Sequence, residues 1–194
     1  MAQQLEINTP RLILKSVNPE IIHALFDTKT QEEIIKFFGV DEDSYLHLKS
    51  MHEQGMETHR LSLFYFLLLD KESNRVIGEC GFHNWNSTHR RAELFYSLRN
   101  DADKRKGLMT EALSAVLDFG FTQLELHRIA ALVASSNTPS LKLLEHYGFM
   151  KEGTMREDYV VDGKNEDSEC YSLLKWEWEQ HNQKNQADGS ERKY

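Results

Sequence analysis

The stretch NDADKRKGLMTEALSAVLDFGF, residues 100–121, places the densest positive cluster of the chain directly before a helical pattern. Lys104, Arg105 and Lys106 follow one another, and a single glycine, Gly107, comes next. Cations are unfavourable at a helix N-terminus, where the aligned peptide dipoles already place partial positive charge. We therefore expect an anionic ligand here, bound by the free N–H groups of the first helical turn.

The glycine pattern of this loop excludes two common nucleotide-binding motifs. It has neither the Gly-x-x-x-x-Gly-Lys-Ser/Thr spacing of a P-loop nor the Gly-x-Gly-x-x-Gly spacing of a dinucleotide fold. Gly107 nevertheless allows the backbone to approach a ligand closely. A solvated basic turn is the alternative interpretation, and the loop alone does not decide between the two.

Length and charge limit the class of protein. The 194 residues suffice for one domain with a substantial core, and 23 basic against 31 acidic residues give a net charge of −8. This balance argues against nucleic-acid binding and favours a cationic substrate or partner. The longest apolar run, 61–69, is too short to span a bilayer, and we expect no signal peptide.

Cysteine and histidine usage indicates neither disulfides nor a metal site. Cys80 and Cys170 lie 90 residues apart, and the nine histidines form no His-Glu-x-x-His motif. Free thiols suit a reducing compartment. We therefore expect a cytoplasmic protein without a metal, a membrane or a nucleic acid as partner.

The apolar periodicity predicts an α/β (α+β) fold with a central mixed sheet. In residues 91–98 the alternation is strict: Ala92, Leu94, Tyr96 and Leu98 share one face, and Glu93, Phe95 and Ser97 share the other. Strands are expected over 10–16, 61–70, 75–85, 91–98, 127–134, 149–161 and 166–178, and helices over 19–27, 31–38, 41–56, 107–124 and 138–147. We assign residues 1–180 to the domain and expect the polar tail 181–194 to be disordered.

The order of AELFYSL, RKGLMTEAL, HRIAALVASSN and NTPSLKLLEHYGF resembles the GNAT superfamily of N-acetyltransferases. Within it, the likeness is to RimJ/RimL-type enzymes, the ribosomal-protein-alanine N-acetyltransferases, and TPRLILKS is similar to their opening strand. The resemblance implies a twisted sheet of about seven strands that splays between the fourth and fifth. It also implies that acetyl-CoA lies in this V, so that its pyrophosphate is the anion on the cationic loop.

The resemblance further implies which residues contact acetyl-CoA. These are Arg105, Lys106, Gly107, Leu108, Met109 and Thr110 at the pyrophosphate, Tyr96, Ser97 and Leu98 along the pantetheine arm, and Asn137 by its side chain. The family loop usually reads Gln/Arg-x-x-Gly-x-Gly/Ala, and of these anchors only Gly107 is retained. Backbone N–H donation survives at Arg105 if its dihedral angles are ordinary. A plain helix N-cap is the alternative role for Asn137.

Two side chains are the candidates for proton transfer. Many members of the superfamily place a tyrosine acid where this chain has Leu144, whereas the RimJ/RimL-type group uses a serine at the place of Ser140. A first-turn capping serine is the alternative. Glu93 is the candidate base, because it lies mid-strand beside the expected cofactor arm, where burial would raise its pKa. An ion pair with Arg90 or Arg91 is the alternative for Glu93.

The sequence therefore predicts transfer of an acetyl group from acetyl-CoA to a primary amine by direct attack in a ternary complex. The resemblance favours a protein N-terminal amine as acceptor, and a small amine such as a polyamine or an antibiotic is the alternative. A non-catalytic CoA-binding or regulatory module is a third interpretation. We expect a monomer or a homodimer.

Overall fold

Eight strands form one sheet in the order β1-β2-β3-β4-β5-β6-β8-β7 in the computed structural model, which describes residues 4–58, 60 and 62–187. All neighbouring strands are antiparallel except β5 and β6, which are parallel. The predicted mixed sheet is thus confirmed, with one strand more than expected because the short β1 pairs with β2. The strands are β1 (Glu6–Asn8), β2 (Leu12–Val17), β3 (Ser62–Asp70), β4 (Val76–Asn86), β5 (Arg91–Leu98), β6 (Arg128–Ala134), β7 (Met150–Val161) and β8 (Lys164–Leu174).

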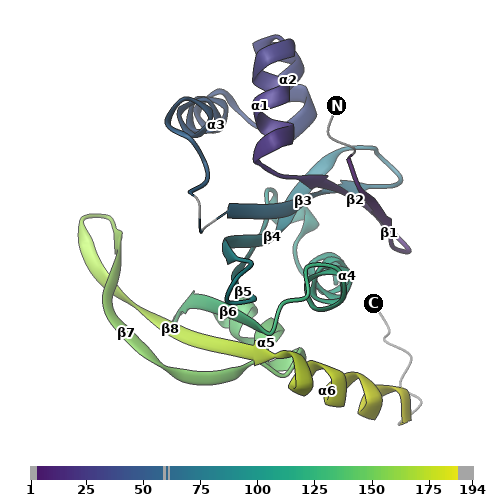
Figure 1. The fold of residues 1–194 in the computed structure, drawn as a ribbon, viewed down its shortest axis with the longest axis vertical. Helices are drawn as coiled ribbons and strands as arrows, with labels where there is room; N and C mark the ends of the chain where they lie inside the picture. Colours follow the sequence, from purple (N-terminus) through teal and green to yellow (C-terminus); the bar gives the residue numbers. More distant parts are fainter. Residues whose placement is uncertain (1–3, 59, 61, 188–194) are drawn as a thin grey trace.

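Helices cover both faces of this sheet (Figure 1). Two helix starts are capped as the sequence indicates: Asn18 accepts a hydrogen bond from the backbone N–H of Ile21, and Thr30 forms a capping box with Glu33. Among the described residues, no helix is long and apolar enough to cross a membrane. The helices are α1 (Pro19–Thr28), α2 (Gln31–Phe38), α3 (Glu42–Gln54), α4 (Leu108–Thr122), α5 (Thr138–His146) and α6 (Lys175–Ala187).

The C-terminal segment differs from the prediction. The last strand ends at Leu174 instead of Trp178, and the chain then turns into α6. Trp178 stacks on Phe121 of α4 with ring centroids 5.1 Å apart, a tertiary contact that outweighs the strand-like pattern of the sequence. Residues 181–187, expected to be disordered, continue this helix, and residues 188–194 lie outside the described part.

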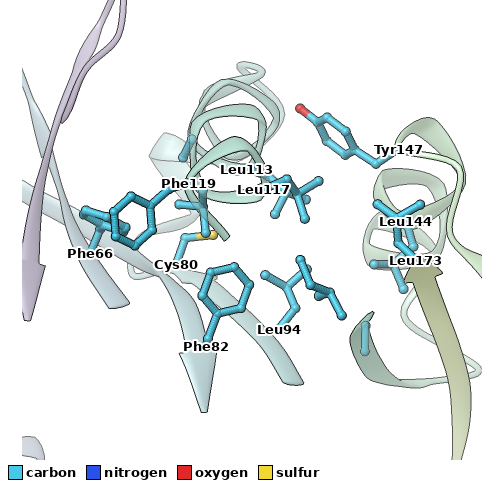
Figure 2. Packing of buried hydrophobic residues seen from close by; sticks show 14 of the residues in the cluster. Phe66, Cys80, Phe82, Leu94, Leu113, Leu117, Phe119, Leu144, Tyr147 and Leu173 are labelled. Carbon is cyan, nitrogen blue, oxygen red and sulfur yellow. The ribbon is translucent and has the colours of Figure 1, made fainter. Parts of the chain in front are cut away.

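The sheet separates two hydrophobic clusters. α4 and α5 pack on one face, where Leu94 of β5 contacts the cluster that also holds Leu113 and Leu144 (Figure 2). The helices α1, α2 and α3 pack on the other face, against a second cluster that receives Phe95. The predicted alternation of β5 is therefore confirmed, and each side of this strand faces a different environment.

Gly120 marks the closest approach of α4 to the sheet. A Cβ atom at this position would lie 2.6 Å from the Cζ atom of Phe82, whose side chain is fully buried on β4. The absence of a side chain therefore allows α4 to sit close to β4.

We expect Gly120→Ala to destabilise the protein, although alanine is the better helix former by about 1 kcal/mol. Overpacking against Phe82 typically costs about 1–3 kcal/mol, so urea unfolding should give a lower free energy of unfolding. Phe82→Leu in the same background removes the obstructing ring. The double variant should therefore lose less stability than the sum of the single variants, and strict additivity would contradict this packing role.

Candidate active site

The parallel strands β5 and β6 are paired only at their beginnings. The register covers three pairs, the last of which joins Glu93 to Ala130. Beyond it β5 continues to Leu98 and β6 to Ala134, so the two strands diverge into a V. The predicted splay is confirmed, between the fifth and sixth strands in the present numbering. Diverging strands leave backbone groups free to pair with an extended ligand.

The loop before α4 contains two residues in the left-handed conformation. Arg105 has φ 60° and Gly107 has φ 73°. Arg105 therefore does not have ordinary dihedral angles, and its backbone instead has the conformation that the glycine of the family motif adopts freely. For a residue with a Cβ this conformation costs about 1–2 kcal/mol. Gly107 is the N-cap of α4 and provides no side-chain cap to the first-turn N–H groups.

The three cations of this loop differ in ion pairing and exposure. The ammonium group of Lys104 lies 2.7 Å from the carboxylate of Asp101, which partly neutralises it. Arg105 and Lys106 are exposed. The positive charge nearest to the start of α4 therefore comes from these two side chains.

Hydrogen bonds of Glu111 and Arg11 hold the loop before α4 in place. The buried carboxylate of Glu111 on α4 accepts hydrogen bonds from the hydroxyl of Thr9 at 2.6 Å, from the backbone N–H of Arg11 at 2.7 Å and from its Nε at 2.6 Å. Arg11 Nη1 in turn donates to the carbonyl oxygen of Lys106 at 2.8 Å. The sequence does not indicate this role of Glu111 and Arg11 except through the TPRL stretch before the first long strand.

The first turn of α5 lies across the V from β5. Ser140 lies beside Tyr96: burial raises the pKa of the Tyr96 phenol, and the Ser140 side chain opposes this rise. Asn137 Oδ1 accepts a hydrogen bond from the backbone N–H of Ser140 at 3.2 Å and is the N-cap of the helix. The structure thus contains the capping role of Asn137, and its contact with acetyl-CoA stays a prediction.

Leu144 of α5 and Tyr147, the C-cap residue of this helix, are structural. Leu144, at the place of the tyrosine acid found in many superfamily members, is fully buried. Tyr147 is 3% exposed, and its hydroxyl donates to the carbonyl oxygen of Thr110 on α4. Figure 2 shows the Tyr147 ring directed toward α4. This hydrogen bond joins the end of α5 to the first turn of α4, so Tyr147 has a packing role.

Glu93 has different partners from those expected. Its Oε1 lies 3.1 Å from Nε2 of His83, and its Oε2 accepts a hydrogen bond from Asn84 at 3.2 Å. The hydrogen bond with His83 holds the pKa of Glu93 below its usual range and outweighs the effect of partial burial. The expected rise in this pKa is therefore wrong, and His83, rather than Arg90 or Arg91, is the basic partner.

A groove of 1310 Å³ lies between β3, β4 and β5 on one side and α2 and α3 on the other. Ser97, predicted to line the pantetheine arm, lines this groove with its side chain, whereas Tyr96 and Leu98 pack toward α4. Phe95 and Met51 contribute apolar surface. The charged and imidazole side chains of the lining are Lys36, Asp41, Asp43, His47, Arg75, Glu79, His83 and Arg99.

Arg99 connects the groove to the end of α2. Its Nη1 donates to the carbonyl oxygens of Phe38 and Gly39, and its Nη2 lies 3.8 Å from Glu79 Oε2. Burial raises the pKa of Glu79, and Arg99 opposes the shift. No group of three His, Cys, Asp or Glu side chains within the described ranges could hold a metal ion. The chemistry available here is thus that of carboxylates, imidazoles and hydroxyls.

Sequence comparison identifies the family. The model of the acetyltransferase (GNAT) domain matches residues 11–150. The uncharacterized N-acetyltransferase p20 of Bacillus licheniformis is 34% identical over 175 residues, 88% of this chain and 96% of that protein. The [ribosomal protein uS5]-alanine N-acetyltransferase of Escherichia coli is 32% identical over 132 residues, 68% of this chain and 64% of that protein. The chain belongs to the GNAT family and is an N-acetyltransferase of that family.

Solved structures share the fold. The spermidine/spermine N-acetyltransferase SpeG of Vibrio cholerae has a TM-score of 0.66 at 21% identity and covers 89% of this chain and 98% of its own. The ribosomal-protein-S5-alanine acetyltransferase of Vibrio fischeri has a TM-score of 0.64 at 22% identity, covering 90% and 98%. These values confirm the GNAT fold.

We expect Glu111→Gln to weaken the hydrogen bonds that hold the loop before α4. We also expect its free energy of unfolding to fall less on acidification than that of the wild type. Burial alone would raise the pKa of Glu111, but hydrogen bonds from Thr9 and Arg11 outweigh it and lower that pKa. A carboxyl group with a lowered folded-state pKa stabilises the fold above its unfolded pKa, and this stability is lost as pH falls through the folded pKa. The wild type should therefore lose stability below about pH 4.5.

Urea unfolding at pH 7 and at lower pH measures both effects. Loss of part of the hydrogen-bond network should cost Glu111→Gln about 1–2 kcal/mol at pH 7, and its stability should fall less steeply on acidification. Asp118→Asn, at an exposed position of the same helix, is the matched control and should resemble the wild type. Parallel pH dependences for the wild type and Glu111→Gln would contradict the assigned role.

Proposed function

We propose that the protein transfers the acetyl group of acetyl-CoA to a primary amine by direct attack in a ternary complex. The observation that carries this proposal is the arrangement around the V, where an uncapped first turn of α4 and the Tyr96–Ser140 pair flank two half-paired strands. An extended pantetheine arm suits strands with free backbone groups. A pyrophosphate suits the free N–H groups of a helix start.

The chain's own residues fit acetyl-CoA in charge and shape. Residues 105–110 would hold the pyrophosphate through backbone N–H groups, while Arg105 and Lys106 offset its negative charge. The hydrogen bond from Arg11 to the carbonyl oxygen of Lys106 stabilises one conformation of the loop before the ligand binds. Asn137 can cap α5 and still present its amide nitrogen to the pantetheine arm.

Acetyl transfer needs a donor for the departing thiolate, and Ser140 is the residue that we assign to it. Its backbone N–H is bound by Asn137, which fixes the position of the residue at the start of α5. Its hydroxyl lies beside the phenol of Tyr96; Ser140 would give its proton to the sulfur as the C–S bond breaks and regain one from solvent. No covalent enzyme intermediate is required.

We further propose a protein N-terminal amine as the acceptor. The groove of 1310 Å³ exceeds the range of about 300–1,000 Å³ typical of small-molecule pockets, which supports a peptide segment. The 32% identity to a ribosomal protein uS5-alanine N-acetyltransferase supports the same class. A small polyamine is the second candidate, because the spermidine/spermine N-acetyltransferase SpeG shares the fold; the charge of the groove lining favours neither acceptor, since it contains three basic side chains and three carboxylates.

Acetyl-CoA turnover against a panel of acceptors tests this function. The panel contains peptides with a free N-terminal alanine or serine, the same peptides with a blocked N-terminus, and spermidine. We expect acetylation of the free N-termini and none of the blocked peptides. Turnover of spermidine alone would show that the acceptor is a polyamine and not a protein N-terminal amine. CoA binding without any turnover would favour a non-catalytic module.

Variants of Gly107 test the cofactor site in the same assay. Gly107→Asp adds a side chain and a negative charge beside the pyrophosphate, so CoA binding in calorimetry should be lost. Gly107→Asn is the matched control of equal size without the charge, and asparagine tolerates a positive φ. It should retain more affinity than Gly107→Asp. A change in the Gly107→Asp dissociation constant below about threefold, roughly 0.7 kcal/mol, would contradict the loop assignment.

We expect Ser140→Ala to lower kcat by about 10²- to 10⁴-fold while the dissociation constant of CoA stays nearly unchanged. The reason is that protonation of the leaving group matters only in the transition state. Ser136→Ala, at an exposed position of the preceding loop, is the control and should behave as the wild type. If kcat is unchanged in single-turnover experiments that isolate the chemical step, Ser140 has only a structural role.

A further inference from the structure

The geometry points to His83 as the group that takes the proton from the acceptor ammonium, with Glu93 as the positioning residue that holds the imidazole. This inference rests on the proposed acetyl transfer and changes the role of Glu93 within it. Its basis is the contact of 3.1 Å between His83 Nε2 and Glu93 Oε1, together with the position of His83 in the lining of the groove.

Strand register places this pair at the vertex of the V. His83 of β4 and Glu93 of β5 are direct cross-strand partners, and Glu93 also forms the last β5–β6 pair, with Ala130. Beyond this pair the strands separate. The two side chains therefore lie where the V begins, on the face of the sheet opposite α4, and an acceptor in the groove meets this face.

The imidazole, rather than the carboxylate, is the more accessible of the two groups. The side chain of His83 is 43% exposed, whereas that of Glu93 is 22% exposed. Both oxygens of Glu93 are also occupied, one by His83 and the other by the Asn84 amide at 3.2 Å. The imidazole of His83, rather than the carboxylate of Glu93, is therefore accessible to an ammonium group in the groove.

The hydrogen bond also determines which ring nitrogen can accept a proton. A carboxylate only accepts hydrogen bonds, so the neutral His83 ring carries its proton on Nε2 and a lone pair on Nδ1. Glu93 is held ionised, since the hydrogen bond with His83 lowers its pKa. Phe95 packs edge-on against the imidazole, with ring centroids 5.5 Å apart and planes at 89°, which limits rotation of the ring. Glu93 thus orients the base.

The proton balance of the reaction gives His83 one defined task. The acceptor ammonium carries three protons, of which one stays on the amide nitrogen. The nitrogen loses a second proton as the C–N bond forms, and the CoA thiolate gains one proton as the C–S bond breaks, so these two changes balance. The third leaves the ammonium before attack, and we assign it to His83 Nδ1, from which it passes to solvent.

Other titratable groups face the same groove and must be separated from His83. They are Tyr65 of β3, Glu79 of β4, His47 and Asp43 of α3, Asp41, Lys36 of α2, Arg75 and Arg99. Glu79 is the strongest competitor because its pKa is raised by burial, but it lies beside Arg99, which favours its charged form. His47 is the other imidazole of the lining.

The pH dependence of kcat/KM with the best peptide acceptor tests the assignment. The wild type should show a rise of kcat/KM with pH, because the base must be unprotonated to accept a proton from the ammonium group. His83→Gln should be slower by about 10²- to 10⁴-fold near neutrality, should lack this rise, and should recover at high pH, where the amine is already neutral. Glu93→Gln should keep the rise, because His83 is still present, but with a loss of about 10- to 100-fold since the ring is no longer oriented.

Two control variants and a binding measurement accompany these profiles. His89→Gln, at an exposed position of the β4–β5 turn, should behave as the wild type. His47→Gln should keep the rise with pH whatever its effect on KM. Unchanged CoA affinity and unfolding temperature in His83→Gln and Glu93→Gln show that both variants are folded.

Three results would overturn the assignment. These are a wild-type pH profile in His83→Gln, loss of the rise in Glu93→Gln while His83→Gln keeps it, and loss of the rise in Glu79→Gln alone. A wild type that turns over no acceptor instead contradicts the proposed function, and the base assignment with it. Nitrogen-15 spectra of His83 give a readout independent of turnover: the Nε2-protonated tautomer is expected, and an Nδ1-protonated ring would overturn the proposal.

Discussion

The arrangement of the site depends on the hydrogen bonds that the buried carboxylate of Glu111 accepts. It satisfies donors from Thr9 and Arg11 and thereby joins the turn before β2 to the first turn of α4. Arg11 extends this connection to the backbone of Lys106. A loop with two left-handed residues is not stable in one conformation by its local sequence alone. Residues about 100 positions apart therefore determine its shape.

The sheet divides the proposed chemistry between its two faces. On the side of α4 and α5, Tyr96 and Ser140 form the pair that we assign to the thiolate. On the opposite side, His83 and Glu93 form the pair that we assign to the ammonium. The alternation of β5 explains this division, since neighbouring residues of a strand point to opposite faces. Two proton transfers of opposite direction are thus kept apart by one strand.

Much of this arrangement could be predicted from the sequence, because the relevant signals are local. The alternation in residues 91–98, the caps at Asn18 and Thr30, and the glycine before α4 each reflect short-range chemistry. The failures concern long-range contacts. The partners of Glu93 follow from the β4–β5 register, and the α6 helix follows from the packing of Trp178 on α4.

The short pairing of β5 with β6 has a consequence for how stability is distributed in the molecule. A ladder of three pairs joins the two halves of the sheet, whereas β6 and β8 share seven pairs. Cooperativity between the halves must therefore come from side chains beneath α4, where Leu94 of one half and Leu173 of the other belong to the same cluster (Figure 2). Amide hydrogen exchange at the vertex of the V thus reports on this packing more than on the ladder itself.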